Sequence, residues 1–376
     1  MILGCVNVLA DEMNPARVAA LRLGTGEAMV AFTVQINCGS GMQSIDTAYR
    51  YIREGVADLI LAGGAESLSH APLVFSNKAV NWYGQLFAAR TFGAKASAIL
   101  AFRPGYFKPV IGLEQGLTDP ITNLNMGQTA ELVGHLFHIT RRQADEYAAE
   151  SQQRLASAQK NGCLAGEIEP AFARDGHVFD HDDGVRPDST PDTLAKLRPA
   201  FERPWGKVTP GNSSQITDGA SWVILASEDA LRKYKLTPKA VIVDSEWSAL
   251  DPSVMGLGPV YCSTAILKRH QLALGDIELW ELNEAFAAQV LGCLAAWQDA
   301  EFCRDALGLA APAGSIPRDR LNVDGGAIGT GHPVGASGNR IVLHLINAMK
   351  RLGYKRGIAT ECIGGGQGGA MLIEAI

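Results

Sequence analysis

The chain has 376 residues, of which 47% are hydrophobic and 19% are charged, and its formal net charge is −6. This length is enough for two or three domain-sized units with a large core, and the negative charge argues against a nucleic-acid partner. No apolar run predicts a membrane span, and the N-terminus lacks the pattern of a secretory signal. The seven cysteines have no disulfide-scaffold or zinc-ligand spacing, which favours a reducing, cytoplasmic compartment.

Residues 1–8 and 33–37 have the pattern of strands, and Cys38 with its neighbouring glycines follows the second strand. A helix is expected next, because apolar residues recur at helical spacing as far as Gly55. Met42, Ile45, Tyr49 and Ile52 are predicted to lie on one face of this helix. The apolar run at 58–62 then predicts a strand that is covered on both faces, as in an α/β protein.

The segment between Ser67 and Leu113 contains no Asp or Glu. Its cations are Lys78, Arg90, Lys95, Arg103 and Lys108. Its aromatic residues are Phe75, Trp82, Tyr83, Phe87, Phe92, Phe102, Tyr106 and Phe107. Two interpretations stay open for this segment. It is either a helical lid over a substrate tunnel or a basic amphipathic surface that meets a membrane or a partner subunit.

A helix is predicted from about Thr140 to Lys160, because Thr140 and Gln143 form a capping box and Asn161-Gly162 end the pattern. Residues 163–211 contain six prolines and an acidic cluster at 180–183, which predicts a loop-rich insertion. Strand–helix alternation resumes from Ala240. The strand and glycine-rich turn around Cys38 are echoed by residues 357–369, which suggests an internal duplication.

Two residues lie in settings that suit nucleophilic catalysis. Cys38 lies where a strand ends and a helix begins, so the helix amides are expected to lower its pKa; the alternative is a buried structural cysteine. His332 lies in a loop with six glycines from Gly325 to Gly338. An imidazole there is suited to accept a proton from a thiol, although it is otherwise a structural histidine. The helix after it is expected to bury Ile341, Leu345, Met349 and Leu352.

Cys362 precedes a glycine run, 364–369, that formally satisfies GxGxxG. A dinucleotide site is rejected because no crossover helix can follow in the few remaining residues. A hairpin between two terminal strands is expected instead, with N–H groups that stabilise an oxyanion. Asn283 is predicted to open a helix after the strand 277–282, where it acts either as an N-cap or as the holder of a water in an oxyanion site.

Together these segments resemble the thiolase family, over essentially the whole chain. The matching segments are Asn37-Cys38-Gly39-Ser40-Gly41, Asn283-Glu284-Ala285-Phe286-Ala287, Gly331-His332-Pro333 with Gly335-Ala336-Ser337-Gly338, and Cys362-Ile363-Gly364-Gly365-Gly366. Segments 194–201, 211–214 and 218–220 are similar to that family too. The resemblance implies two α/β halves stacked in α-β-α-β-α layers. The halves are expected at 1–66 with part of 211–235 and at 236–376, and an inserted loop domain is expected at 67–210.

The resemblance also implies roles for individual residues. Cys38 would accept the acyl group, and His332 would deprotonate it and then bind the thioester oxygen together with a water held by Asn283. Cys362 would be the second acid/base, and the backbone N–H groups of Cys38 and Gly364 would form the other oxyanion hole. Residues expected to contact acyl-CoA or CoA are Met126, Met255, Phe286 and Ser213. CoA is expected as a co-substrate, with no metal and no resident cofactor.

The implied reaction is cleavage of 3-oxoacyl-CoA to acetyl-CoA and a shortened acyl-CoA, or the reverse condensation. The long insert is similar to that of thiolases that work beside a β-oxidation α-subunit, which favours the degradative direction. A homodimer or tetramer is implied, with residues 67–113 as the surface for such a subunit or a membrane. The alternatives are a decarboxylating ketosynthase, which Cys362 argues against, and a truncated inactive paralogue that acts as an assembly subunit.

The front of the chain departs from the family pattern, which normally begins about 50 residues earlier with a strand and a helix. We therefore expect unpaired backbone and an uncovered apolar face in the first sheet. This expectation concerns stability and oligomerisation more than chemistry, since all four matching segments are present.

Overall fold

Two four-stranded sheets organise the chain in the computed structural model, which describes residues 1–376. The first has the order β2-β1-β3-β8, with β1 (Ile2–Gly4), β2 (Phe32–Val34), β3 (Leu59–Ser67) and β8 (Asp218–Ala226). The second has the order β10-β11-β12-β9, with β9 (Ala240–Ala249), β10 (Leu279–Leu282), β11 (Arg356–Ile363) and β12 (Gln367–Ala375). The first three strands of the first sheet are parallel, and β10 and β11 are parallel in the second.

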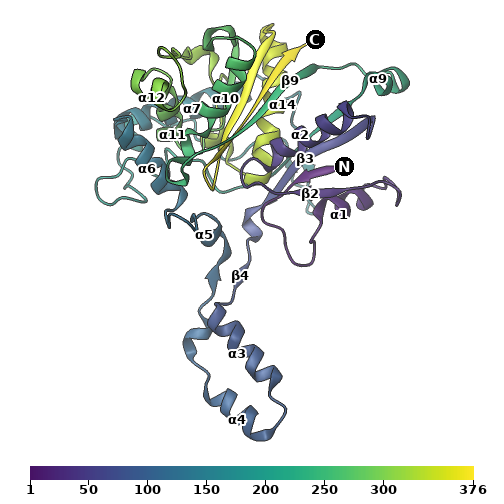
Figure 1. The fold of residues 1–376 in the computed structure, drawn as a ribbon, viewed down its shortest axis with the longest axis vertical. Coiled ribbons are helices and arrows are strands. Elements are labelled where there is room, and N and C mark those ends of the chain that lie inside the picture. The colour runs from purple at the N-terminus through teal and green to yellow at the C-terminus, as the bar shows by residue number, and fades with distance from the viewer.

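Two helices, α2 (Ser40–Arg53) and α14 (Val334–Leu352), form the layer between the sheets (Figure 1). Met42 and Ile45 of α2 are buried in one core with side chains of α14 and of both sheets. The outer layers are α10 (Gly258–Arg269), which packs on the second sheet, and α1 (Pro15–Arg22), which packs on the first. The predicted α-β-α-β-α layers are therefore confirmed.

The central helices cross closely because glycines face each other where they meet. A Cβ on Gly41 would lie 2.7 Å from the backbone nitrogen of Asn339. A Cβ on Gly338 would lie 2.7 Å from the backbone nitrogen of Met42. These glycines hold the first turns of the two helices together, and therefore also the loops that carry Cys38 and His332.

The remaining elements surround this core. The helices are α5 (Gly112–Gly116), α6 (Met126–Leu136), α7 (Arg141–Lys160), α8 (Pro191–Leu194), α9 (Glu228–Tyr234), α11 (Ala287–Ala296), α12 (Ala300–Asp305) and α13 (Ala327–Thr330). The 3-10 helices of the body are η1 (Leu68–His70), η3 (Pro252–Leu257), η4 (Leu274–Asp276) and η5 (Arg318–Arg320). The insertion at 163–211 contains only α8 and the short strands β6 (Ala171–Phe172) and β7 (Val178–Phe179), as its loop-rich sequence predicts.

One segment leaves the body of the molecule, as Figure 1 shows. It comprises β4 (Leu73–Val74), α3 (Asn77–Ala88), α4 (Phe92–Leu100), the 3-10 helix η2 (Pro104–Phe107) and β5 (Val110–Ile111). We call residues 73–111 the helical arm. The strands β4 and β5 pair antiparallel where the arm joins the body. No helix of the structure has the length and apolar character needed to cross a membrane.

Several predicted elements are confirmed with their local signals. The capping box of Thr140 and Gln143 starts α7, and Gly55, after α2, has a positive φ of 70°. Three details were wrong. The strand expected at 33–37 is β2, which ends at Val34; Leu352, at the exposed end of α14, is not buried; and Asn283 does not open a helix, since α11 begins at Ala287.

The expected defect at the front of the chain is not found. β1 pairs with β2 on one side and with β3 on the other, so its backbone is not left unpaired. The apolar face of this sheet is covered, because Leu3 is buried with Ala16 and Ala20 of α1. The first sheet is therefore continuous from β2 to β8, and β1 is paired on both sides.

Candidate active site

A cavity of about 730 Å³ lies at the ends of strands from both sheets and is lined by residues from both halves of the chain. Cys38, His332, Cys362 and Gly364 all line it. The predicted substrate contacts that line it too are Met126, Met255, Phe286 and Ser213. The structure therefore brings together every predicted site residue except Asn283, which lies outside the lining.

Cys38 is in the short loop between β2 and α2. The side chain of Asn37 donates a hydrogen bond of 2.8 Å to the carbonyl oxygen of Gly364, and a Cβ on Gly39 would lie 2.5 Å from Cδ1 of Ile363. These contacts fix the Cys38 loop against the hairpin between β11 and β12. Strand residues 356–363 and 367–375 pair antiparallel, so the glycine-rich hairpin is confirmed.

The Cys38 thiol is held in its neutral form. Burial raises its pKa to about 12, the charge of Glu361 adds to this effect, and hydrogen bonds from the backbone N–H groups of Gly364 and Cys38 oppose it. The prediction of a lowered pKa was wrong, because desolvation outweighs the nearby amides. These backbone N–H groups of Gly364 and Cys38 are the ones predicted to form an oxyanion hole.

His332 lies between α13 and α14, after Gly331 with its positive φ of 89°. Its Nδ1 is 2.6 Å from Oγ of Ser337, which also donates to the carbonyl oxygen of Pro333. Since a hydroxyl has one proton to donate, Ser337 accepts from Nδ1–H of His332. The buried Nε2 then carries the free lone pair, and it has no partner within the protein. Burial, helped by the charge of Arg340, lowers the pKa of His332 to about 4.

Cys362 is near the end of β11 and packs with Met255 and Ala285, against which Met126 and Phe286 lie. Burial raises the pKa of its thiol well above the usual range, and the nearby Cys38 adds to this effect. Both cysteines are free. The cavity therefore contains two neutral thiols and one neutral imidazole.

Asn283 directly follows β10, and its backbone N–H donates to the carbonyl oxygen of Thr360 at 2.9 Å. Asn283 therefore lies beside Thr360 of β11, and Thr360 is two residues before Cys362. It is 1% exposed, and neither polar atom of its side chain bonds to the protein. A buried amide of this kind costs about 1–3 kcal/mol, which fits a residue that binds a small polar molecule. Its alternative role as an N-cap was wrong.

Sequence analysis missed the buried acids that hold the loops in place. Glu284 accepts hydrogen bonds from Tyr147, Ser151 and Asn322, and so fixes the turn after Asn283. Glu66 accepts from the backbone N–H groups of Asn7 and Gly335, and so fixes the start of α14. The available signal was an isolated Glu beside small or apolar residues in each segment.

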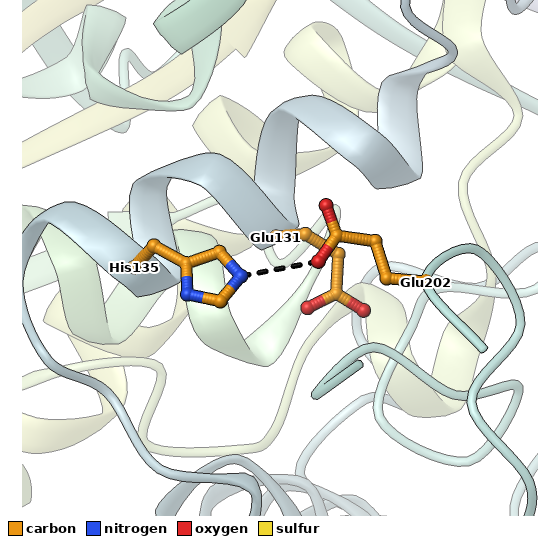
Figure 2. A group of neighbouring side chains, drawn as sticks. All are labelled: Glu131, His135 and Glu202. Atoms are coloured by element: carbon orange, nitrogen blue, oxygen red, sulfur yellow. Dashed lines mark hydrogen bonds and ion pairs between the residues drawn. The ribbon is translucent and has the colours of Figure 1, made fainter. Parts of the chain in front are cut away.

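Figure 2 shows a group of side chains that bring donor atoms within 4.8 Å of one another: Glu131, His135 and Glu202. The carboxylate of Glu131 already accepts hydrogen bonds from the backbone N–H groups of Lys207 and Val208. The ammonium of Lys207 is 3.3 Å from Nδ1 of His135, and a cation there disfavours a second one. These contacts anchor the loop at 202–208, and the absence of a metal stays a prediction.

Comparisons with known proteins agree with this geometry. Residues 1–229 match the family model of the thiolase N-terminal domain, and residues 236–375 match that of the C-terminal domain. A probable acetyl-CoA acyltransferase of Staphylococcus epidermidis is 36% identical over 100% of this chain and 86% of its own length. The acetyl-CoA acetyltransferase of Chromobacterium violaceum is 38% identical over 100% of this chain and 87% of its own length.

Two solved structures are also similar. The acetyl-CoA acetyltransferase of Bacillus anthracis has a TM-score of 0.84 and 34% identity, over 100% of this chain and 86% of that one. Human mitochondrial 3-ketoacyl-CoA thiolase has a TM-score of 0.83 and 36% identity, over 100% and 87%. The family model matches from the first residue and both structures cover the whole chain, so the expectation that a front segment is lacking is not borne out. The chain belongs to the thiolase family.

Proposed function

We propose that this thiolase cleaves 3-oxoacyl-CoA with CoA, giving acetyl-CoA and an acyl-CoA shortened by two carbons. The observation that carries the proposal is that Cys38, His332 and Cys362 line one cavity. The relatives named acetyl-CoA acyltransferase and 3-ketoacyl-CoA thiolase support it. No finding favours an inactive paralogue, and a ketosynthase would not use a second cysteine.

In the first half-reaction, Nε2 of His332 accepts the proton of the Cys38 thiol while the sulfur attacks the 3-oxo carbon. The neutral pair is the resting state, because the pKa of Cys38 is raised to about 12 and that of His332 is lowered to about 4. Proton transfer must therefore accompany formation of the S–C bond. The developing oxyanion would be stabilised by nearby N–H donors and by the imidazolium, with a water held by Asn283.

Collapse of this adduct breaks the C–C bond and expels the enolate of acetyl-CoA. Cys362 would donate its proton to the enolate carbon, which the raised pKa of its thiol permits. The resulting Cys362 thiolate then takes the proton of an incoming CoA thiol. The CoA sulfur attacks the thioester, and the departing Cys38 sulfur takes back its proton from His332. CoA is thus a co-substrate, and the reaction is ping-pong.

The cavity supports an acyltransferase for chains longer than acetoacetyl. Apolar side chains contribute to its lining, among them Leu113, Leu117, Ile121 and Phe201. Hydrophobic walls of this kind favour an alkyl chain. Together with the long insert, they support the degradative direction. Thiolysis rates for acetoacetyl-CoA and for a medium-chain 3-oxoacyl-CoA, measured side by side, test this preference. A turnover confined to the shortest substrate contradicts it.

The chemical proposal is tested by following the loss of 3-oxoacyl-CoA absorbance with the wild type and with Cys38→Ala. Cys163→Ala, which removes a free cysteine outside the cavity, is the matched control. We expect thiolysis by the wild type and the control, and none by Cys38→Ala. Brief exposure to acetoacetyl-CoA should add about 42 Da, the mass of an acetyl group, at Cys38. Light scattering tests the expected homodimer or tetramer.

A further inference from the structure

Two features of the molecule take no part in the proposed reaction. One is the helical arm: no residue from 73 to 111 lines the catalytic cavity, so the lid interpretation of this segment was wrong. The other is a second cavity of about 480 Å³, lined by residues of α14, of the edge strand β8 and of the segment 164–182. No residue lines both cavities. The second cavity therefore needs an explanation of its own.

A cation without a partner lines this second cavity. Arg340 lies on α14 and is half-buried. Its guanidinium makes no hydrogen bond or ion pair with the protein, and its Nε is buried without a partner. Guanidinium groups that are removed from water are normally paired with an anion. Arg340 is therefore free to bind an anionic group inside the cavity.

An anion without a partner lines the same cavity. The carboxylate of Asp182 makes no hydrogen bond or ion pair with the protein. Burial raises its pKa, and the charge of Arg340 opposes this effect. The two opposite charges thus share one cavity without contacting each other. This arrangement leaves space between them for a molecule that carries both a negative and a positive group.

Most other charged residues of the lining are already paired. His344 contacts Glu167 at 2.7 Å, and Asp324 pairs with Arg351. His181 contacts Asp180 at 2.6 Å, and Glu169 is exposed. These residues leave Arg340 and Asp182 as the unpaired charges that are shielded from solvent.

The remaining surface of the cavity is mainly apolar. Its apolar side chains are Leu155, Leu164, Ile168, Phe179, Trp222 and Leu343. Walls of this kind favour an apolar group, and the few polar groups among them fix the orientation of a ligand. The cavity therefore suits a small molecule with two opposite charges and an apolar side chain.

We propose that the second cavity binds a free α-amino acid with an apolar side chain. The carboxylate of the amino acid accepts hydrogen bonds from Arg340, its ammonium donates to Asp182, and its side chain packs on the apolar walls. A simple anion would be repelled by Asp182 and Glu169, and a simple cation by Arg340. A zwitterion satisfies both charges at once.

The proposed ligand would contact the loop that carries the catalytic base. Gly325 and Thr330 of this loop line the second cavity, whereas His332 lines the catalytic one. The amino-acid site and the catalytic site are therefore neighbours that share no lining residue. Binding at the second cavity should consequently be measurable while the catalytic cavity is occupied.

The test is calorimetric titration of the full chain with L-phenylalanine and with two analogues. One analogue, 3-phenylpropanoate, lacks the ammonium, and the other, 2-phenylethylamine, lacks the carboxylate. We expect L-phenylalanine to bind, and each analogue to bind at least about 10-fold more weakly, because each loses a charged hydrogen bond. Saturating CoA should leave the affinity for L-phenylalanine unchanged.

Two variants assign the two charges. Asp182→Asn should weaken the binding of L-phenylalanine about 10-fold without weakening that of 3-phenylpropanoate. Arg340→Gln should weaken the binding of L-phenylalanine without weakening that of 2-phenylethylamine. The matched controls are Asp188→Asn and Arg174→Gln, since both residues are exposed, unpaired and outside the lining. Both controls should bind as the wild type does, and circular dichroism shows whether each variant is folded.

Four results would overturn the proposal. The first is that the wild type does not bind L-phenylalanine at millimolar concentration. The second is that both analogues bind as tightly as L-phenylalanine, and the third is that CoA displaces it, which would place it in the catalytic cavity. The fourth is that Asp182→Asn binds as its control does, a comparison that decides alone if Arg340→Gln does not fold. None of these results bears on the proposed thiolase chemistry, which the thiolysis assay measures separately.

Discussion

The side-chain amide of Asn37 donates to the carbonyl oxygen of Gly364 at 2.8 Å and thereby joins two loops that are 327 residues apart. One loop carries Cys38 and the other follows Cys362. This hydrogen bond and the packing of Gly39 on Ile363 join the two loops. We therefore expect Asn37 to influence catalysis although it has no chemical role of its own.

Asn37→Ala should lower kcat about 10- to 100-fold, because the two thiols are no longer held in register. It should also lower the free energy of unfolding by about 1–3 kcal/mol, since Asn37 has a positive φ of 47° that alanine tolerates poorly. Gln271→Ala is the control, because Gln271 has a φ of 55° far from the cavity. Similar kcat losses in both variants would show that backbone strain, and not the hydrogen bond, is responsible.

Ser337→Ala should lower kcat about 10- to 100-fold with little change in KM, because His332 loses the partner that keeps its proton on Nδ1. Steady-state kinetics and the pH profile of kcat measure this effect, and Ser337→Thr should restore part of it. Ser263→Ala serves for comparison, since its buried hydroxyl makes no hydrogen bond. Unchanged kinetics in Ser337→Ala would refute the positioning role.

Cys362→Ala should separate the two chemical steps. Breaking the C–C bond needs an acid for the enolate, so thiolysis should fall by about 100- to 10,000-fold. Transfer of an acetyl group from acetyl-CoA to Cys38 needs no carbon acid, so the acetyl adduct should still form. Mass spectrometry of the intact protein detects it. Loss of both steps would mean that proton exchange between Cys362 and the CoA sulfur is essential as well, so that the two steps are not separable.

A second buried histidine should control stability at alkaline pH. His344 contacts Glu167 at 2.7 Å and faces Glu281, Asp324 and Arg340. Burial lowers its pKa, but the charges of Glu281 and Glu167 prevail and raise it to about 8. Its contribution is therefore complete below the ordinary value of 6.5 and is lost as the pH rises through 8. The free energy of unfolding should fall by about 2 kcal/mol from this group.

Urea unfolding at several pH values between 6 and about 9 measures that slope. His344→Gln should be less stable at the acidic end of this range, because Glu167 and Glu281 lose the imidazolium beside them, and its slope should be flatter. His181→Gln, at an exposed site, should keep the wild-type slope. A slope that persists in His344→Gln would assign the effect to another group.

The site could be located from sequence because each reactive residue lies in a short segment with its own local signal. The glycines around Cys38, His332 and Cys362 predict tight loops, and the capping box of Thr140 and Gln143 predicts the start of α7. The direction of the pKa shift of Cys38 could not be predicted in this way, since it depends on burial by residues hundreds of positions away. The role of Glu284 was missed for the same reason: its partners Tyr147 and Asn322 come from other segments.

The projection of the helical arm from the body could not be predicted either, because composition indicates an amphipathic segment but not whether that segment packs on the rest of the molecule. Likewise, Asn283 has the residue type of an N-cap, yet β10 is followed by a four-residue turn before α11 begins. Tertiary packing decides both outcomes.

Because each half of the chain supplies one thiol, and the base comes from the second half, neither half is an enzyme alone. During synthesis, residue 38 leaves the ribosome long before residues 332 and 362 exist, so the sulfhydryl of the nascent first half has no base beside it. Acyl-CoA in the surroundings cannot load an unfinished polypeptide by the enzymatic route. The cavity has all three reactive groups only once the last strand pair, β11 and β12, has formed.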